Sequence, residues 1–134
     1  MPLPLEPIVN RPMIRTFVVD FYGRVRADNT LGPIFNERLE GIWDEHFEKL
    51  TDFWMTVLGG IPAYKGNPFG AHHKVVKEGQ HRMKAEHFDI WLTYFDASVK
   101  DTLPPELAAI AREKARRIAD SLRKGLFFRL SAAE

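Results

Sequence analysis

Histidine has the widest chemical reach of the residues in this chain, because neutral imidazole is a common metal ligand and titrates near neutral pH. His46 lies one helical turn before Leu50 on the apolar face of a predicted helix, since residues four apart on a helix are neighbours. His72 follows a segment rich in glycine and proline. Taken alone, each is a metal ligand or an ordinary core or surface histidine, and both interpretations stay open. The chain has five histidines: His46, His72, His73, His81 and His87.

Two aromatic residues carry polar atoms that could reach a bound molecule. Tyr22 lies beside Phe21 at the inner edge of the first predicted helix. A buried tyrosine normally finds a partner for its hydroxyl, so Tyr22 is either a core residue bonded to backbone or a donor aimed into a pocket. Trp91 poses the same question, with an indole N–H that can only donate.

Several other chemistries find no support. The chain has no cysteine, which excludes disulfides, thiolate catalysis, iron–sulfur clusters and thiolate-bound zinc. A di-iron bundle requires two Glu-x-x-His pairs, whereas only Glu78 and His81 have that spacing here, in a polar segment. Motifs for zinc proteases, serine hydrolases, phosphate-binding loops and dinucleotides are absent. The basic residues of the last predicted helix, which Glu113 interrupts, are typical of a solvated face.

The composition is that of one ordinary globular domain. The chain has 134 residues, of which 45% are hydrophobic and 28% charged. Its formal net charge of +1 favours neither nucleic acid nor a membrane as partner, and its apolar runs are too short to span a bilayer. The proline-rich start does not read as a signal peptide, so we expect a cytoplasmic protein. The 12% of aromatic residues suit a core around a flat group or any well-packed helical core.

The hydrophobic period is helical wherever it is strong, which predicts an all-α domain. Asn10 is the expected cap of the first helix and Pro12 fits its first turn. Gly59 and Gly60 should end the second long helix, and Pro105 should open the last one. The predicted long helices are 12–27, 42–58, 85–102 and 104–126.

Shorter pieces connect these helices. A break is expected over 28–33, followed by a short helical piece that contains Ile34, Phe35 and Leu39. Segments 59–70 and 77–84 read as loops, with a weakly indicated helix over 68–75. Residues 1–11 and 130–134 are expected to be flexible tails, which leaves 12–129 as the domain.

Four strings, in order, resemble group III truncated hemoglobins. The resemblance covers about residues 12–128, and it implies a truncated globin fold, a 2-on-2 helical sandwich around heme b. The first string matches the family's B helix and CD corner, the second its E helix, the third its proximal loop and F helix, and the fourth its G helix. They are Phe21-Tyr22-Gly23-Arg24-Val25-Arg26 with Leu31-Gly32-Pro33-Ile34-Phe35, Trp43-x-x-His46-x-x-Lys49-Leu50-x-x-Phe53-Trp54, Tyr64-Lys65-Gly66-Asn67-Pro68-Phe69-Gly70-Ala71-His72, and His87-Phe88-x-x-Trp91-Leu92.

The resemblance implies that His72 is the proximal ligand of the heme iron. Its neighbour His73 is a rival, but consecutive helical residues point about 100° apart, so only one can face the iron. The Asn-Pro-Phe-x-x-His spacing favours His72. On the distal side the resemblance places Tyr22 and Trp91 as hydrogen-bond donors to bound gas, with His46 as a third donor or a gate.

The resemblance also assigns a lining to the heme. Phe35 matches the phenylalanine that stacks on it at the CD corner, and Leu50 matches an apolar distal wall residue. Lys49 is a candidate partner for a heme propionate or an ordinary solvated lysine. The residues expected near the porphyrin or in the core behind it are Phe21, Phe53, Trp54 and Phe88.

The implied function is binding of dioxygen, nitric oxide or carbon monoxide at the iron by a monomer. The alternative is a redox enzyme, a nitric oxide dioxygenase or peroxidase-like protein. It would need an external reductase, because the chain has no flavin or nicotinamide fingerprint. A helical interaction domain without a cofactor is the third possibility, and it leaves the four strings unexplained.

Overall fold

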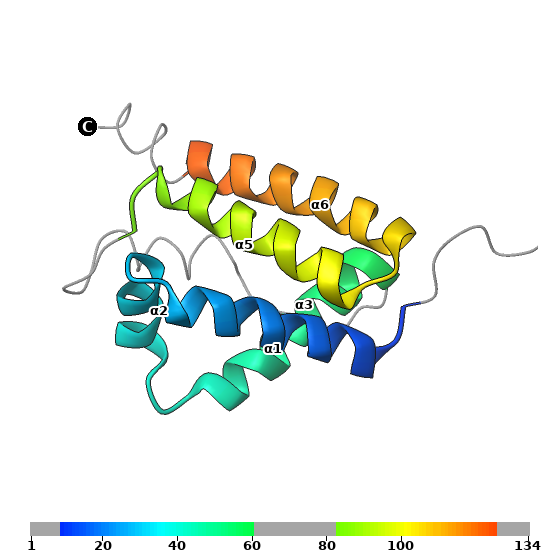
Figure 1. The fold of residues 1–134 in the computed structure, drawn as a ribbon, viewed down its shortest axis with the longest axis horizontal. Coiled ribbons are helices and arrows are strands. Elements are labelled where there is room, and N and C mark those ends of the chain that lie inside the picture. Colours follow the sequence, from blue (N-terminus) through cyan, green and yellow to red (C-terminus); the bar gives the residue numbers. More distant parts are fainter. Residues whose placement is uncertain (1–8, 61–82, 126–134) are drawn as a thin grey trace, which may run out of the picture.

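The protein is described by a computed structural model that covers residues 9–60 and 83–125, and this part of the chain is all-α. Two pairs of long helices pack on each other, with α1 against α3 and α5, and α5 against α6 (Figure 1). The short helix α2 lies beyond the end of α1. The helices are α1 (Arg11–Ala27), α2 (Leu31–Leu39), α3 (Trp43–Gly59), α5 (His87–Thr102) and α6 (Pro105–Arg123).

The first helix begins as its sequence predicts. The Asn10 side chain accepts a hydrogen bond from the backbone N–H of Met13, at 3.0 Å, and a proline lies in the first turn. The cap and the proline together set this end of α1, because the cap satisfies an N–H that has no partner within the helix and proline needs none. The expected Asn10 cap is therefore confirmed.

The corner between α1 and α2 depends on one glycine. A Cβ atom at Gly32 would lie 2.5 Å from the carbonyl oxygen of Arg26, so only glycine lets the two helices approach this closely. The break expected over 28–33 is shorter than predicted, because α2 already begins at Leu31. Gly32 and Pro33 lie in its first turn, where proline's missing N–H costs nothing.

The core lies where the helix pairs meet. Phe17 of α1, Trp54 of α3 and Phe95 of α5 are almost completely buried and contact one another at centroid distances of 5.2–6.0 Å. Small side chains on α6 allow that helix to pack closely against its neighbours. The buried alanines of α6 are Ala108, Ala111, Ala115 and Ala119.

The ends of the other long helices also follow the sequence. Helix α3 ends at Gly59, and Gly60 follows with a φ of +67°, a left-handed conformation that suits glycine. Helix α5 starts at His87, two residues later than expected, and Pro105 opens α6. The weakly indicated helix over 68–75 and most of the two expected tails lie outside the described residues.

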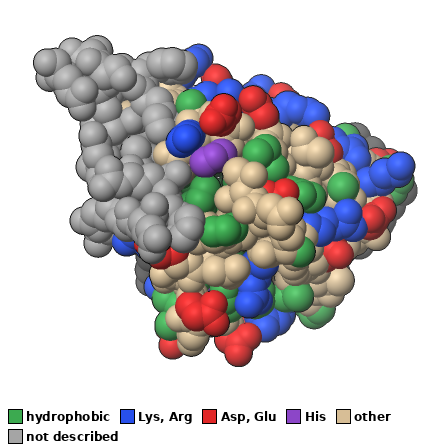
Figure 2. All heavy atoms as spheres, turned by 60° about the vertical axis from the view of Figure 1, so that its left-hand side comes forward, with side chains coloured by type: hydrophobic (Ala, Val, Ile, Leu, Met, Phe, Trp, Pro, Cys, Tyr) green, Lys and Arg blue, Asp and Glu red, His purple; other side chains and the backbone are tan. Residues whose placement is uncertain are grey.

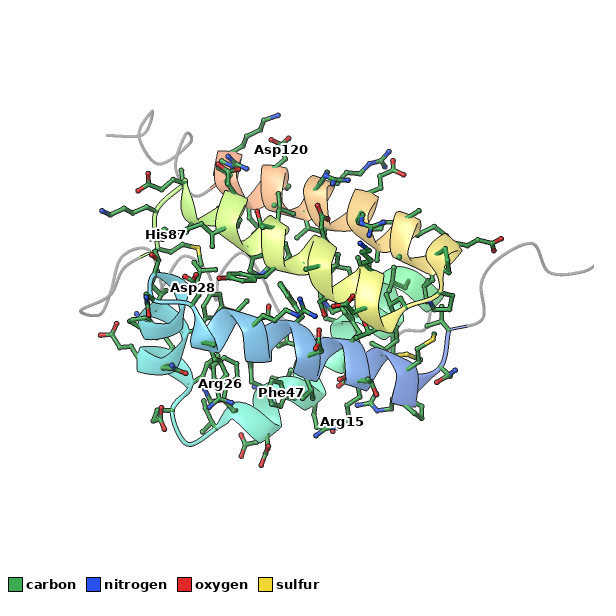
Figure 3. The ribbon with its side chains drawn as sticks, in the orientation of Figure 1. Arg15, Arg26, Asp28, Phe47, His87 and Asp120 are labelled. Carbon is green, nitrogen blue, oxygen red and sulfur yellow. The ribbon has the colours of Figure 1, made fainter. Side chains whose placement is uncertain are left out.

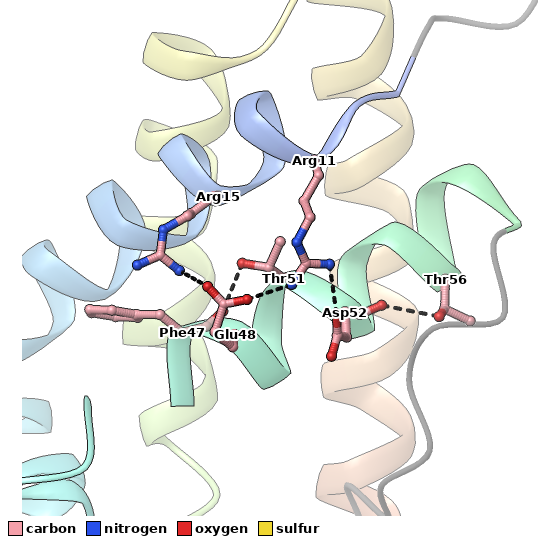
Figure 4. Close-up of polar contacts among 7 residues, drawn as sticks. All are labelled: Arg11, Arg15, Phe47, Glu48, Thr51, Asp52 and Thr56. Carbon is pink, nitrogen blue, oxygen red and sulfur yellow. Dashed lines mark hydrogen bonds and ion pairs between the residues drawn. The ribbon is translucent and has the colours of Figure 1, made fainter. Parts of the chain in front are cut away.

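Charges of both signs are interspersed on the face drawn in Figure 2, as the near-zero net charge suggests. Several of them join helices. Arg11 and Arg15 of α1 bind Glu48 of α3, and Arg11 also binds Asp52 (Figure 4). Within the described ranges, no helix is both long enough and apolar enough to cross a membrane.

Candidate functional site

Tyr22 carries a buried hydroxyl group near the end of α1. Only 5% of the residue is exposed. Burial raises the pKa of the phenol to about 12, and a hydrogen bond from Trp91 offsets part of that rise. The hydroxyl therefore stays neutral and keeps its proton throughout the physiological pH range.

Trp91 of α5 is held beside Tyr22 by packing. Its ring lies 5.2 Å from Phe21 and 5.4 Å from Phe95, and the residue is half-buried. Since an indole N–H can only donate, Trp91 is the donor and the Tyr22 oxygen the acceptor in the interaction that lowers the phenol pKa. The sequence placed both groups as donors to a ligand, but it did not reveal that they bond to each other.

His46 of α3 completes a group of polar rings from three helices. Its ring centroid lies 6.2 Å from that of Tyr22, with the two planes 85° apart. The imidazole is half-buried, so it stands at the boundary between the interior and the solvent. The structure thus brings together Tyr22, His46 and Trp91, which lie far apart in the sequence.

The residues expected to line a heme fall into two sets. Phe35 of α2 lies 5.8 Å from the Tyr22 ring and is half-buried, as are Leu50 and Phe53 on α3, whereas Lys49 is exposed. The second set belongs to the core. Its members are Phe21 with no exposure, Trp54 at 2% and Phe88 at 5%, the last with the Arg123 guanidinium 5.9 Å from its ring centroid.

Sequence reasoning gave no site role to two further buried residues, of which Trp43 lies beside this group. Trp43 is buried, and its ring contacts those of both Tyr22 and His46. Its spacing of three residues from His46 on one helix was the available signal. His87 is also buried, and its Nδ1 accepts a hydrogen bond from the backbone N–H of Lys84 at 2.9 Å. Figure 3 places His87 near Asp28, where α5 begins and α1 ends.

The predicted iron ligand His72 and its rival His73 lie outside the described residues. The described residues nonetheless suit heme, a flat and largely apolar group. Phe35 of α2 packs 5.8 Å from the Tyr22 ring, whose hydroxyl stays neutral at physiological pH, and Leu50 and Phe53 of α3 add further half-buried apolar surface. Such a surface can cover a porphyrin face and present a neutral donor to whatever binds above it.

Helices packed two on two, with a tyrosine, a histidine and a tryptophan gathered from α1, α3 and α5, define a globin of the truncated kind. The sequence model of the bacterial-like globin family matches residues 6–124. The chain therefore belongs to the bacterial-like globin family, among the group III truncated hemoglobins. Globins are heme proteins, so this chain is a heme-binding globin.

A relative and a solved structure give the extent of the similarity. The group 3 truncated hemoglobin ctb of Campylobacter jejuni subsp. jejuni is 31% identical over 122 residues, which are 89% of this chain and 92% of the relative. The crystal structure of group III truncated hemoglobin from Campylobacter jejuni matches with a TM-score of 0.79 at 29% identity. That match covers 95% of this chain and 96% of the other. The predicted family and all-α fold are confirmed.

Proposed function

We propose that this globin binds a diatomic gas, dioxygen, nitric oxide or carbon monoxide, at a heme iron held by His72. The observation that carries the proposal is the buried hydroxyl of Tyr22, whose ring centroid lies 6.2 Å from that of His46. When bound, the heme supplies an iron with one open coordination position for the gas. We propose heme b, since a chain without cysteine cannot attach heme through thioether bonds.

Tyr22 would act as the principal donor to the gas. Its proton is retained at physiological pH because burial raises the phenol pKa to about 12. A donor fixed in advance in a water-poor site stabilises negative charge on a ligand better than mobile water does. Trp91 strengthens this action, because a hydroxyl oxygen that accepts a hydrogen bond is a better donor through its own proton.

His46 would supply a third polar group with a different property. An imidazole can donate or accept a hydrogen bond through its ring nitrogens, so its action depends on how the ring is turned. Its half-buried position beside Tyr22 suits a group that touches the ligand in one orientation and turns toward solvent in another. We therefore assign His46 both a donor role and a gating role.

The remaining predicted residues would seat the heme and keep water away from it. Phe35, Leu50 and Phe53 are half-buried and offer apolar surface to a porphyrin. Phe21, Trp54 and Phe88 would act from behind, as the packed layer that fixes the lining. Lys49 is exposed on α3, where its ammonium group can pair with a propionate without being desolvated.

An absorption spectrum tests the proposal directly. Protein produced with heme should show a Soret band, and the reduced protein should shift that band with carbon monoxide. His72→Ala should abolish proximal ligation while the matched control His73→Ala keeps it. Equal loss of heme from both variants would overturn the assignment of His72.

The gas-binding role can be separated from the redox alternative by turnover with nitric oxide, dioxygen and a reductant. Rapid formation of nitrate with slow release of dioxygen would indicate a dioxygenase that depends on an external reductase. Reversible uptake of dioxygen without a product would indicate binding alone.

A further inference from the structure

Trp43, the first residue of α3, is held in place from three helices. Its Nε1 donates a hydrogen bond to the Oδ1 of Asn36 on α2, at 3.1 Å. The guanidinium of Arg26 on α1 lies 4.5 Å from the centre of the indole. The ring of Phe47 on α3 packs at 5.6 Å, and only 6% of Trp43 is exposed. Figure 3 shows Arg26 and Phe47 on this side of the molecule, where α1 faces α3.

The same indole touches two of the residues proposed to face the gas. Its ring centroid lies 6.1 Å from that of Tyr22 and 5.9 Å from that of His46, with the His46 plane turned by 80°. Tyr22 and His46 also contact each other at 6.2 Å. The three rings thus form a closed triangle, in which Trp43 is further held by Asn36 of α2 and Arg26 of α1.

We propose that Trp43 is a positioning residue, which fixes the imidazole of His46 against Tyr22 and so sets how often His46 faces the gas. The proposal rests on the function proposed above, in which Tyr22 and His46 face the ligand. Trp43 precedes His46 by three residues and shares its helix face, so the indole occupies space into which the imidazole would otherwise turn. An edge-to-face contact favours one mutual orientation of two rings.

The anchors of Trp43 should differ in their effect. The hydrogen bond to Asn36 fixes which way the indole N–H points, because this N–H is the one hydrogen-bonding group of the ring. Arg26 is exposed and rests on the ring face, which holds the plane weakly. Loss of the Asn36 acceptor should therefore loosen the triangle more than loss of the Arg26 charge.

The stretching band of carbon monoxide bound to the reduced holoprotein tests this, because its frequency reports the polar groups around the gas. Wild type should give a dominant band. Trp43→Ala should split or broaden it and change the release rate of the gas roughly two- to tenfold, the scale of one aromatic contact. Trp43→Phe should lie between. An unchanged band and rate in Trp43→Ala would overturn the proposal.

Controls separate positioning from general loosening. Leu107→Ala removes a buried side chain of α6 that does not belong to the site, so it should lower stability and leave the band as in wild type. An equal band change in Leu107→Ala would overturn the positioning role. Asn36→Leu should reproduce part of the Trp43→Ala change, whereas Asn36→Asp keeps an acceptor and should keep the dominant band of wild type. Equal behaviour of the two Asn36 variants would contradict the role of this anchor.

Tyr22→Phe distinguishes the failure of this proposal from failure of the function beneath it. If Tyr22→Phe leaves the carbon monoxide band and the release of dioxygen unchanged, the proposed distal site is wrong. If Tyr22→Phe changes them and neither Trp43→Ala nor Asn36→Leu does, the distal site stands and Trp43 is a structural residue only.

Discussion

Two clusters of aromatic rings in this globin have opposite designs. In the core, Phe17 and Phe95 have no exposure and Trp54 has 2%, and their rings fill the space between helix pairs by edge-to-face and tilted contacts. In the distal cluster, Tyr22 and His46 carry polar atoms, and His46 is only half-buried. The core cluster uses aromatic side chains for their volume, whereas the distal cluster uses them to hold polar atoms at fixed positions.

The two clusters are neighbours, yet the core cluster should serve mainly stability and the distal cluster mainly gas binding. Phe21 links the clusters, because its ring packs on Phe95 at 5.2 Å, on Trp91 at 5.2 Å and on Tyr22 at 4.6 Å. Rings that fill volume should affect unfolding most, and rings that hold polar atoms should affect gas binding most. Substitutions in the two clusters can test this division.

The largest expected effect is on stability, from Phe95→Ala in the core cluster. Removal of a fully buried phenylalanine ring should lower the free energy of unfolding by about 3–5 kcal/mol, measured by urea denaturation of the holoprotein. Tyr22→Phe, a change in the distal cluster that keeps the ring, removes only a hydroxyl and should cost far less. Equal losses would show that the two clusters do not differ in kind. Phe95→Leu offers a milder variant if the alanine form does not fold.

The next effect is on gas release. Tyr22→Phe should speed the release of dioxygen by about 10- to 100-fold, because a hydrogen bond to a charged acceptor is worth about 1.5–3 kcal/mol. Trp91→Phe should have a smaller effect, since its N–H bonds to the Tyr22 oxygen. The double variant should then release dioxygen no faster than Tyr22→Phe, as measured by stopped flow. Additive effects would instead indicate two independent donors.

The sequence predicted the helices well because their ends carry local signals. Asn10 caps α1, Pro105 opens α6 and Gly60 follows the end of α3, all as expected. The early start of α2 at Leu31 was missed because Gly32 and Pro33 resemble a turn, and only the packing against Arg26 explains the glycine. Local patterns therefore predicted the helices but not how neighbouring helices pack at their corner.

The distal site was only partly predictable for a physical reason. Tyr22, His46 and Trp91 were identified by resemblance, and the structure brings them together. The bond between Tyr22 and Trp91 joins different helices, and no spacing along the chain encodes it. Trp43 was missed because its contacts with Arg26 and Asn36 also join helices. The assignment of His72 stays a prediction.

A smaller effect should come from His87, at the corner where α5 begins. Burial lowers the pKa of its imidazole, with Lys84 adding to the fall while Glu86 and Asp28 oppose it. Below about pH 6.5 the His87 imidazole is protonated in the unfolded chain but stays neutral in the folded chain until a lower pH. The free energy of unfolding should therefore fall as pH decreases from that value. The bond from the Lys84 N–H, worth about 1 kcal/mol, is lost when Nδ1 is protonated.

His87→Asn is the matched variant for this pH dependence, because the asparagine Oδ1 takes the place of Nδ1 and can accept the same hydrogen bond without titrating. Urea denaturation at pH 7.5 and pH 5.5 should show a smaller loss of stability on acidification in the variant than in wild type. An identical loss would assign the acid sensitivity to other groups. Asp28 titrates in a separate range, since hydrogen bonds lower the pKa of its carboxyl.

The smallest effect should come from the surface contact between α1 and α3. Glu48 accepts from Arg11 at 2.6 Å and also binds Arg15, yet its side chain is 54% exposed. Exposed ion pairs contribute about 0–1 kcal/mol and weaken with salt, so Glu48→Gln should lower the free energy of unfolding by less than about 1 kcal/mol. Urea denaturation in about 0.05 M and about 0.5 M sodium chloride measures that loss. A larger, salt-independent loss would mean that α1 and α3 depend on surface charge, and the core aromatic cluster could not then be the main source of stability.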